Sequence, residues 1–406
     1  MTEKPRIIVV GAGHAGGRAA EALRALGFDG DIVMIGDEPH LPYERPPLSK
    51  EMLQGNPEAG MPMRDSDFWA EKEVELRLGT RAAKLDPAAK TVTLDDGTVE
   101  SFDKLLLTPG GTVRRIGTPH DDLDNVFYLR TLDDSRAIDA RLAPGQRVAV
   151  IGGGFIGLET AASARLRGCD VTVIELADRL MARAVLPEIS RTFLDLHRDK
   201  GVDVRLETGV NALAGDDTAT QVVTDGGERL PADTVVVGIG IAPDTALAEN
   251  AGLDVDNGIV VDEFCRTSHP DIFAAGDVTS HYSPVYDRHI RLESWQNAQN
   301  QAIAAARVMC GEETAHAEVP WMWSDQFDAK LEVAGLPDAW DAVIARGDPA
   351  SGSYMLFQMA GGKPVGAMSV NLPRDMRFAR RLLQSGKSVD VAQLADPDIS
   401  MRDLAR

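Results

Sequence analysis

The sequence predicts an α/β fold in which one strand–loop–helix unit occurs twice. Two glycine-rich loops, Gly11–Gly16 and Gly152–Gly157, start 141 positions apart in a chain of 406 residues. Each loop follows a short β-branched run and precedes an Ala-rich segment. Short apolar runs of this kind are typical of buried parallel strands, and the Ala-rich segments are typical of helices. No segment is of low complexity.

The elements follow in order along each unit. In the first unit we expect a strand at 6–10, a helix at 15–26 and a strand at 31–35. In the second unit the strand at 147–151, the helix at 158–167 and the strand at 171–174 repeat this order. The repeat indicates two separate parallel sheets.

Both loops have the spacing Gly-x-Gly-x-x-Gly, which binds adenine dinucleotides. The first glycine permits a tight turn, the second lets the backbone approach a pyrophosphate, and the third lets helix and strand pack closely. The helix N-terminus then faces the phosphate charge. Two such loops imply two dinucleotides, most simply a flavin and a nicotinamide, between which a hydride can pass.

A carboxylate is expected about 20 residues after each loop to bind ribose hydroxyls. Glu175 ends the strand of the second unit, and an acid there favours NADH over NADPH. Arg179 and Arg183 follow closely, so strict selectivity stays open. In the first unit Gly36 occupies the equivalent position, and we assign Asp37 to the ribose. The alternative is that Asp37 is a turn residue.

The chain crosses between domains at two apolar strands that end in glycine. We expect a discontinuous FAD-binding domain at 1–108 and 241–318, and an NAD-binding domain at 109–240. The run 271–277 ends in Gly276-Asp277, where Asp277 can accept a hydrogen bond from a ribityl hydroxyl. A helix at 293–310 follows, and an α+β domain at 319–406 closes the chain.

Composition excludes several classes of function. The formal net charge of −21 argues against binding to nucleic acid or to an anionic membrane surface. No apolar run is long enough to span a bilayer, and the N-terminus resembles no signal peptide. The three cysteines are far apart, which favours buried thiols in a cytoplasmic protein. We expect no metal site.

The stretch 41–50 contains no cysteine. Disulfide reductases with two dinucleotide loops carry a redox cysteine pair after the first loop. A flavin would therefore be the last redox group on this chain, and the electrons must leave to an external acceptor.

Five motifs together resemble the FAD-dependent NADH:ferredoxin reductases of oxygenase systems. They are the two glycine loops, Arg45–Lys50 (Arg-Pro-Pro-Leu-Ser-Lys), Ala275–Asp277 and Pro320–Gln326 (Pro-Trp-Met-Trp-Ser-Asp-Gln). The resemblance runs from about residue 5 to the C-terminus. It implies a glutathione-reductase-like fold, FAD and NADH as cofactors, and a [2Fe–2S] ferredoxin as electron acceptor, with rubredoxin as an alternative.

The resemblance also implies the residues that bind each cofactor. The FAD site comprises Gly11, Gly13, Ala15, Gly16, Asp37, Lys50, Ala82, Arg130, Gly276, Asp277 and Trp295. The NAD site comprises Gly152, Gly154, Ile156, Gly157, Glu159, Glu175, Arg183 and Gly240.

Lys50 and Glu159 are the implied catalytic residues. The resemblance places Lys50 beside flavin N5, paired with Glu159, so that the pair holds the flavin edge and orients the nicotinamide. Hydride transfer itself requires near-attack geometry and no side-chain proton. From spacing alone, the favoured interpretation is that the two residues are unrelated surface charges.

The sequence defines less closely the residues through which electrons leave the flavin. Trp321 and Trp323 lie either near the flavin and the docking surface or in the core of the third domain. The segment 374–387 sums to +4 and contains Arg374, Arg377, Arg380 and Arg381. Such a basic patch steers an acidic ferredoxin; the alternative is a solvated helix face.

Two rival functions stay open: an NADH oxidase or peroxidase, and an NADH-responsive flavoprotein of the apoptosis-inducing-factor type. The sequence indicates a monomer or a weak homodimer without deciding between them. It identifies neither the ferredoxin nor the terminal oxygenase.

Overall fold

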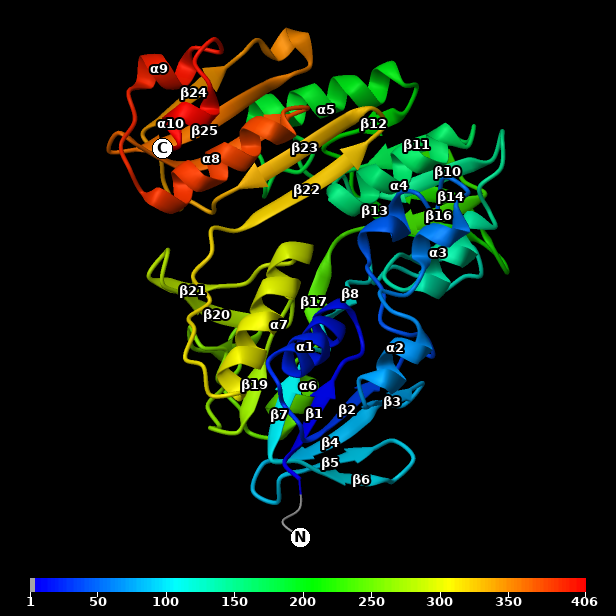
Figure 1. Cartoon of the computed structure of the whole chain (residues 1–406). Helices are drawn as coiled ribbons and strands as arrows, with labels where there is room; N and C mark the ends of the chain where they lie inside the picture. The colour runs from blue at the N-terminus through cyan, green and yellow to red at the C-terminus, as the bar shows by residue number, and fades with distance from the viewer. Residues whose placement is uncertain (1–3) are drawn as a thin grey trace. The chain divides into compact units, whose positions relative to one another are not determined.

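The computed structural model describes residues 4–406. The chain forms two compact units, each built from three separate segments (Figure 1). From here on, 'first unit' and 'second unit' mean these compact units, and each contains one of the two strand–loop–helix repeats. The first unit comprises Met1–Arg45, Met61–Thr112 and Ala242–Pro320; the second comprises Pro46–Gly60, Val113–Ile241 and Trp321–Arg406. Two of the crossings between the units fall in β8 (Gly111–Val113) and β17 (Ile241–Pro243). The predicted division into three domains stays a prediction.

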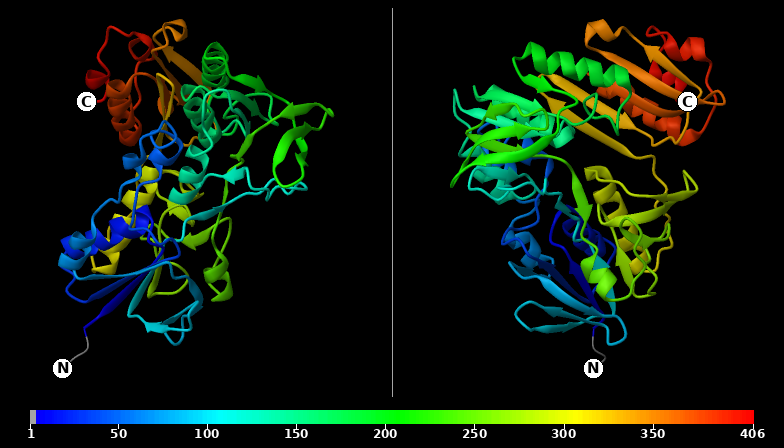
Figure 2. Two further views of the ribbon diagram at one scale, coloured as in Figure 1. Left: turned by 90° about the vertical axis from the view of Figure 1, so that its right-hand side faces the viewer. Right: turned by 180° about the vertical axis from the view of Figure 1, so that it is seen from behind.

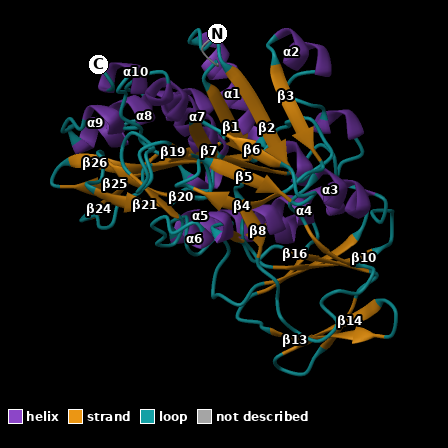
Figure 3. Ribbon diagram, turned by 90° about the horizontal axis from the view of Figure 1, so that it is seen from below, coloured by secondary structure: helices purple, strands orange, loops and turns teal. Residues whose placement is uncertain are grey.

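A five-stranded parallel sheet forms the centre of the first unit. The strand order is β19-β7-β1-β2-β3, and the apolar run of β1 pairs on both sides, with β2 and β7. Figure 3 shows β1, β2 and β3 side by side. The strands are β1 (Arg6–Val10), β2 (Asp31–Gly36), β3 (Val74–Leu78), β7 (Lys104–Leu107) and β19 (Ile272–Ala274).

Alternating residues of β1 face two different cores. Ile7 and Val9 pack in a cluster with residues of the helices α1, α2 and α7, and Ile8 and Val10 pack with residues of small sheets and of α6. Both sheet faces are thus buried, which explains the continuous apolar strands. The helices are α1 (His14–Ala25), α2 (Ser66–Glu71), α7 (Trp295–Met309) and α6 (Ala246–Asn250). The strands of the two small sheets are β4 (Ala82–Asp86), β5 (Thr91–Leu94), β6 (Val99–Ser101), β18 (Ile259–Val261), β20 (Thr279–Ser283) and β21 (Arg288–Ile290).

The second unit repeats this arrangement around a second parallel sheet. The strand order is β12-β11-β10-β16-β9. One face is covered by α4 and α5 and the other by the antiparallel sheet β13-β14-β15. The elements are β9 (Val126–Tyr128), α3 (Leu132–Asp139), β10 (Arg147–Ile151), α4 (Phe155–Leu166), β11 (Asp170–Ile174), α5 (Pro187–Asp199), β12 (Asp203–Arg205), β13 (Val210–Gly215), β14 (Ala219–Thr224), β15 (Arg229–Pro231) and β16 (Thr234–Val237).

The C-terminal segment adds an antiparallel sheet to the second unit. Its order is β22-β23-β26-β25-β24, and α5 and α8 lie on opposite faces of it (Figure 2). Phe193 of α5 belongs to the same core cluster as Leu331 and Tyr354 of this sheet. The elements are β22 (Trp321–Gln326), β23 (Ala329–Ala334), β24 (Ala342–Arg346), β25 (Tyr354–Ala360), β26 (Lys363–Val370), α8 (Pro373–Ser385), α9 (Val391–Ala395) and α10 (Met401–Leu404).

The segment Pro46–Gly60 belongs to the second unit although it follows the first glycine loop in the chain. It contains two short 3-10 helices, Pro46–Ser49 and Pro57–Gly60. The Ser135 hydroxyl donates a hydrogen bond of 2.7 Å to the Leu48 carbonyl, and Leu53 packs in the core of the second unit. Lys50 is thereby fixed beside α4.

Within residues 4–406, none of the helices has the length and apolar character needed to cross a membrane.

The buried residue His281 makes the stability of the fold depend on pH. His281 on β20 lies with its ring 5.2 Å from that of His316. Burial, reinforced by the charges of His316 and His289, lowers the pKa of His281 to about 3. The unfolded side chain has a pKa of about 6.5. Between these values the unfolded chain binds a proton that the native chain does not, so stability is lost as the pH falls below about 6.5.

We therefore expect His281→Gln to weaken the acid sensitivity of the protein. Between pH 7 and pH 4.5 the free energy of unfolding should fall by about 2–3 kcal/mol less in the variant than in the wild type. Urea unfolding at the two pH values measures this. His120→Gln, which removes an exposed imidazole, should leave the wild-type difference unchanged. An equal effect of both variants would contradict the assignment to His281.

Candidate functional site

The first glycine loop has two positions that forbid a side chain and one that faces open space. Gly11 has a φ of +107°, and a Cβ there would lie 2.2 Å from the Thr108 carbonyl oxygen. A Cβ at Gly16 would lie 2.0 Å from the Gly11 carbonyl oxygen. At Gly13 the nearest atom to a Cβ is a guanidinium nitrogen of Arg45, 3.9 Å away. The backbone at Gly13 is therefore open to a ligand.

The second loop has the same construction. Gly152 has a φ of +112° and its Cβ would lie 2.5 Å from the Gly238 carbonyl oxygen. A Cβ at Gly157 would lie 2.0 Å from the Gly152 carbonyl oxygen, whereas Gly154 has no neighbour closer than 4.0 Å. Both loops thus expose backbone at the second glycine of the Gly-x-Gly-x-x-Gly pattern, which is Gly13 in the first loop and Gly154 in the second.

The helices that follow the loops begin without a side-chain cap. Gly13 is the N-cap of α1 and Gly154 is the N-cap of α4, and neither helix has an acidic residue in its first turn. The first N–H groups of both helices therefore lack an anionic partner from their own first turn. Together with the open second glycines, these two N-termini fit the pyrophosphates of two dinucleotides.

Glu175 is held by the backbone around the second loop. Its carboxylate accepts a hydrogen bond of 2.6 Å from the Gly153 N–H and one of 2.7 Å from the Ala177 N–H. Arg179 is occupied by the Ser190 hydroxyl and by the carbonyls of Ala182 and Val185. The anion is thus fixed beside the loop while Arg179 is committed elsewhere, an arrangement that suits a ribose without a 2′-phosphate.

The two acids that follow β2 differ in their surroundings, because one is exposed and the other is hydrogen-bonded to neighbouring side chains. Asp37 is exposed directly after β2. Glu38 accepts hydrogen bonds from the Tyr43 hydroxyl at 2.5 Å and from Arg45 at 2.8 Å. Asp37 is therefore the acid that keeps its side chain open to a ligand, and its assignment to the ribose stays a prediction.

Arg45 is a candidate site residue that the sequence interpretation did not single out. Burial lowers the pKa of Arg45, but Tyr43, Glu38 and Asp277 together outweigh this and raise it. The guanidinium therefore stays charged next to the open glycine Gly13. The signal was present, because Arg45 opens the Arg-Pro-Pro-Leu-Ser-Lys motif.

Gly276 and Trp295 lie in the first unit near the first loop. Gly276 has a φ of +88°, and its N–H donates a hydrogen bond of 2.8 Å to the Gln301 side chain on α7. Trp295 begins α7, and its ring stacks on that of His14 at 5.1 Å. His14 begins α1, and burial lowers its pKa to about 3, so this imidazole is neutral.

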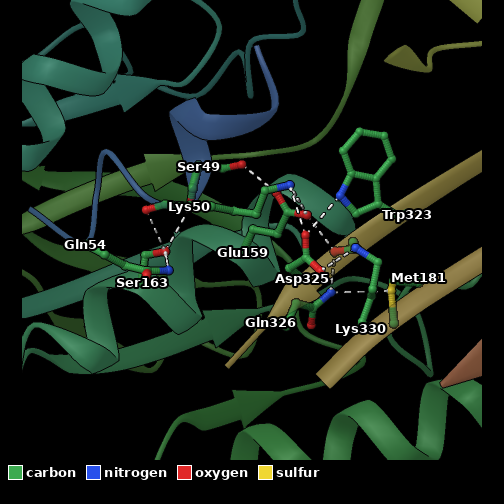
Figure 4. A network of polar contacts seen from close by, with 11 residues as sticks. Ser49, Lys50, Gln54, Glu159, Ser163, Met181, Trp323, Asp325, Gln326 and Lys330 are labelled. Atoms are coloured by element: carbon green, nitrogen blue, oxygen red, sulfur yellow. Dashed lines mark hydrogen bonds and ion pairs between the residues drawn. The ribbon is translucent and has the colours of Figure 1, made fainter. Parts of the chain in front are cut away.

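Lys50 and Glu159 form a buried ion pair in the second unit (Figure 4). Lys50 Nζ lies 3.6 Å from Glu159 Oε1, and the two residues are 6% and 4% exposed. The structure therefore excludes the alternative that they are unrelated surface charges. Burying two charges costs several kcal/mol per ion unless other polar groups compensate.

Two hydroxyls provide that compensation. The Ser49 hydroxyl donates to Glu159 Oε2 at 2.5 Å, and the Ser324 hydroxyl donates to Glu159 Oε1 at 2.7 Å. Burial raises the pKa of Glu159, whereas Lys50 and these two hydroxyls oppose the rise. Ser49 and Ser324 were not singled out in the sequence, although each lies within a quoted motif.

Two stacked indole rings lie next to this ion pair. Trp323 and Trp321 stack with ring centroids 5.3 Å apart and planes 22° apart. Lys50 Nζ lies 5.3 Å from the centre of the Trp323 ring, and Arg380 of α8 lies 4.5 Å from that of Trp321. Both rings are only partly buried. The tryptophans therefore connect the ion pair to the basic helix α8 within the second unit.

The remaining predicted positions are scattered. Ala82 begins β4 and is partly buried, and Arg130 follows β9. Ile156 is 46% exposed in the first turn of α4. Arg183 is exposed, with a guanidinium nitrogen 3.7 Å from where a Cβ of Gly240 would lie. The roles of these residues stay predictions. Over residues 4–406, His, Cys, Asp and Glu side chains form no group able to hold a metal ion.

Comparison with known proteins decides the family. The family model described as pyridine nucleotide-disulphide oxidoreductase matches residues 5–302. This chain belongs to that family. A second model, described as reductase C-terminal, matches residues 321–405. Membership confirms the predicted fold class and the assignment as an oxidoreductase. FAD and NAD(H), the two predicted cofactors, are those of this family.

Individual relatives match along nearly the whole chain. The ferredoxin–NAD(+) reductase component of an anthranilate 1,2-dioxygenase system from Burkholderia cepacia is 48% identical, covering 97% of this chain and 98% of the relative. Rhodocoxin reductase from Rhodococcus erythropolis is 41% identical, with 98% and 93% covered. The covalent complex of putidaredoxin reductase with putidaredoxin contains a chain that matches at a TM-score of 0.96 and 35% identity, with 99% and 98% covered. These matches confirm the resemblance that the five motifs indicated.

The contrast between the glycines of one loop leads to a test. Gly13→Ala adds a methyl group to open space, so we expect the free energy of unfolding of the apoprotein to change by less than about 1 kcal/mol. The same methyl group blocks close approach of the pyrophosphate, and the dissociation constant of FAD should rise about tenfold, equivalent to about 1.4 kcal/mol. Flavin fluorescence titration of the apoprotein measures the affinity.

Gly11→Ala is the matched control for this test. Its methyl group overlaps the Thr108 carbonyl in a left-handed backbone conformation, so this variant should lose stability rather than cofactor affinity alone. Unchanged FAD binding by a folded Gly13→Ala protein would contradict the role assigned to the second glycine.

Proposed function

We propose that this chain is the NADH-dependent ferredoxin reductase of an oxygenase system, with a [2Fe–2S] ferredoxin as its acceptor. One observation carries the proposal: both dinucleotide loops are complete, and the stretch 41–50 supplies a buried lysine but no redox cysteine. The described chain therefore holds two dinucleotides and offers no disulfide for the electrons. The names of its full-length relatives, which are reductase components of oxygenase systems, support the same conclusion.

The two cofactors use different sets of residues. FAD bound at the first loop would supply the redox chemistry, because a flavin accepts two electrons as a hydride and passes them on singly. For FAD we assign the open backbone at Gly13, the cation Arg45 and the acids Asp37 and Asp277. For NADH we assign the open backbone at Gly154 and the fixed carboxylate of Glu175, which disfavours the extra phosphate of NADPH.

Lys50 and Glu159 position the reacting groups in this proposal. Lys50 presents the donors of its Nζ from a fixed position, since its ion-pair partner Glu159 is itself held by two hydroxyls. Glu159 accepts at both oxygens without donating only while it is ionised, and the Lys50 charge favours the ionised form. The pair orients and excludes water rather than transferring a proton during hydride transfer.

The acceptor is proposed to dock on α8. Arg374, Arg377 and Arg381 are exposed on this helix, whereas Met376, Ala379 and Leu382 face the sheet. An acidic ferredoxin is attracted to such a surface even though the whole chain carries −21. Arg380, stacked on Trp321, joins this surface to the tryptophan pair. We also propose that the protein works in the reducing cytoplasm, where Cys169 and Cys265, both buried, remain thiols.

The test is reduction of the purified protein by NADH without air. We expect bound FAD to be bleached within seconds and then reoxidised by a [2Fe–2S] ferredoxin, with slow consumption of NADH in air when no ferredoxin is present. Lys50→Met should bind FAD more weakly and slow flavin bleaching at least tenfold, because the variant lacks the fixed charge.

Lys200→Met is the matched control, since it removes an exposed lysine at the end of α5 that pairs with Asp328 in the turn between β22 and β23. Rapid oxidase activity of the wild type in air would support the oxidase alternative instead. Unaltered FAD affinity and unaltered bleaching in Lys50→Met would remove the role proposed for Lys50.

Charge reversal on α8 tests the docking surface. In Arg377→Glu/Arg381→Glu the apparent KM for ferredoxin should rise about tenfold at low salt, because four units of charge change on the steering surface. The activity with NADH as donor and an artificial dye as acceptor should not change. The control is Arg191→Glu on α5, which is exposed on a helix at the opposite face of the sheet. Equal losses in the ferredoxin and dye assays would rule out docking at α8.

A further inference from the structure

Lys50 lies between two carboxylates rather than one. Its Nζ is 3.6 Å from Glu159 Oε1 and 3.8 Å from Asp325 Oδ2. The two acids differ in their surroundings, because the Glu159 side chain is 4% exposed and the Asp325 side chain is 39% exposed. Asp325 is thus a second counter-ion of the buried ammonium, and it is the one that solvent reaches.

Asp325 is itself fixed by neighbouring strands. The Trp323 indole N–H donates a hydrogen bond of 2.9 Å to Asp325 Oδ2, and Lys330 Nζ lies 3.2 Å from Asp325 Oδ1 (Figure 4). In the antiparallel register of β22 and β23, Asp325 stands directly opposite Lys330. Cross-strand partners of opposite charge stabilise each other, so the sheet holds this carboxylate in place.

The four charged groups form one neutral set. Two ammonium groups, Lys50 and Lys330, alternate with two carboxylates, Glu159 and Asp325, and each link is shorter than 4 Å. Solvent and salt screen charges at a partly buried site much less than charges at an exposed one. Loss of a single member therefore leaves a net charge that persists next to Lys50.

We infer that Asp325 and Lys330 are positioning residues that set the midpoint potential of the bound flavin by controlling how far the charge of Lys50 is compensated. The inference rests on the proposed function, in which Lys50 lies beside the flavin. Charge near the flavin ring is one of the means by which a protein tunes this cofactor. Asp325 lowers the potential by compensating Lys50, and Lys330 counteracts Asp325.

The two residues should therefore act with opposite signs. Reduction adds negative charge to the flavin, so an uncompensated cation favours the reduced form. Asp325→Asn leaves the set with a net charge of +1 and should raise the midpoint potential. Lys330→Met leaves it with a net charge of −1 and should lower the potential. A purely structural role for either residue predicts no such pair of opposite shifts.

The experiment is a spectroelectrochemical titration of the FAD-loaded protein. Asp325→Asn keeps an acceptor for the Trp323 indole, and Lys330→Met keeps the length of the side chain. The matched control is Asp328→Asn, which removes the same charge three residues further along, at a side chain that is 75% exposed and pairs with Lys200. We expect a shift to higher potential in Asp325→Asn and to lower potential in Lys330→Met. Both shifts should persist at high salt and exceed the shift of the control.

The outcomes separate the inference from the proposed function. If the wild type binds FAD and NADH reduces it, but both variants shift in the same direction or no further than Asp328→Asn, the inference is overturned and the proposed function stands. If the wild type binds no FAD, or if NADH does not reduce the bound flavin, both are overturned. Should Asp325→Asn unfold, the sign of the shift in Lys330→Met decides.

Discussion

The burial of Lys50 against Glu159 is the interaction on which the second unit depends. It joins three segments that are far apart in the chain: the 3-10 turn before Lys50, the first turns of α4 and the strand β22. Removing one partner of a buried ion pair typically costs 3–5 kcal/mol, because the other charge is left without compensation. A change in the local structure of any of the three segments would therefore break the ion pair and incur this cost.

The same polar network explains why the C-terminal sheet packs into the second unit. Ser324 reaches Glu159 from β22, and the Gln326 side chain continues the network by donating to Ser324 at 3.0 Å and meeting His197 of α5 at 2.9 Å. Buried polar groups need such partners, since each one left unsatisfied costs about 1–3 kcal/mol. The sheet thus supplies hydrogen bonds to the ion pair as well as apolar surface to the core.

Local features of the fold were predictable from the sequence, whereas contacts that depend on register were not. The loops, the strands that precede them and the Ala-rich helices follow from glycine spacing and side-chain periodicity, which are properties of contiguous residues. The pairing of Lys50 with Glu159 needed the family resemblance, because 109 positions separate the two residues. The pairing of Asp325 with Lys330 depends on the β22–β23 turn, and nothing in the composition of either strand fixes that register.

The position of the basic helix suggests how one surface can serve both attraction and electron transfer. An electron carrier must associate quickly and leave quickly, which favours long-range charge over a large apolar interface. The exposed arginines of α8 provide the charge, and Arg380 places one guanidinium directly on the Trp321 ring. Trp321 in turn stacks on Trp323, which lies against Lys50. In the proposed function, a partner attracted to the arginines is therefore also brought to the aromatic pair that leads back to the buried ion pair.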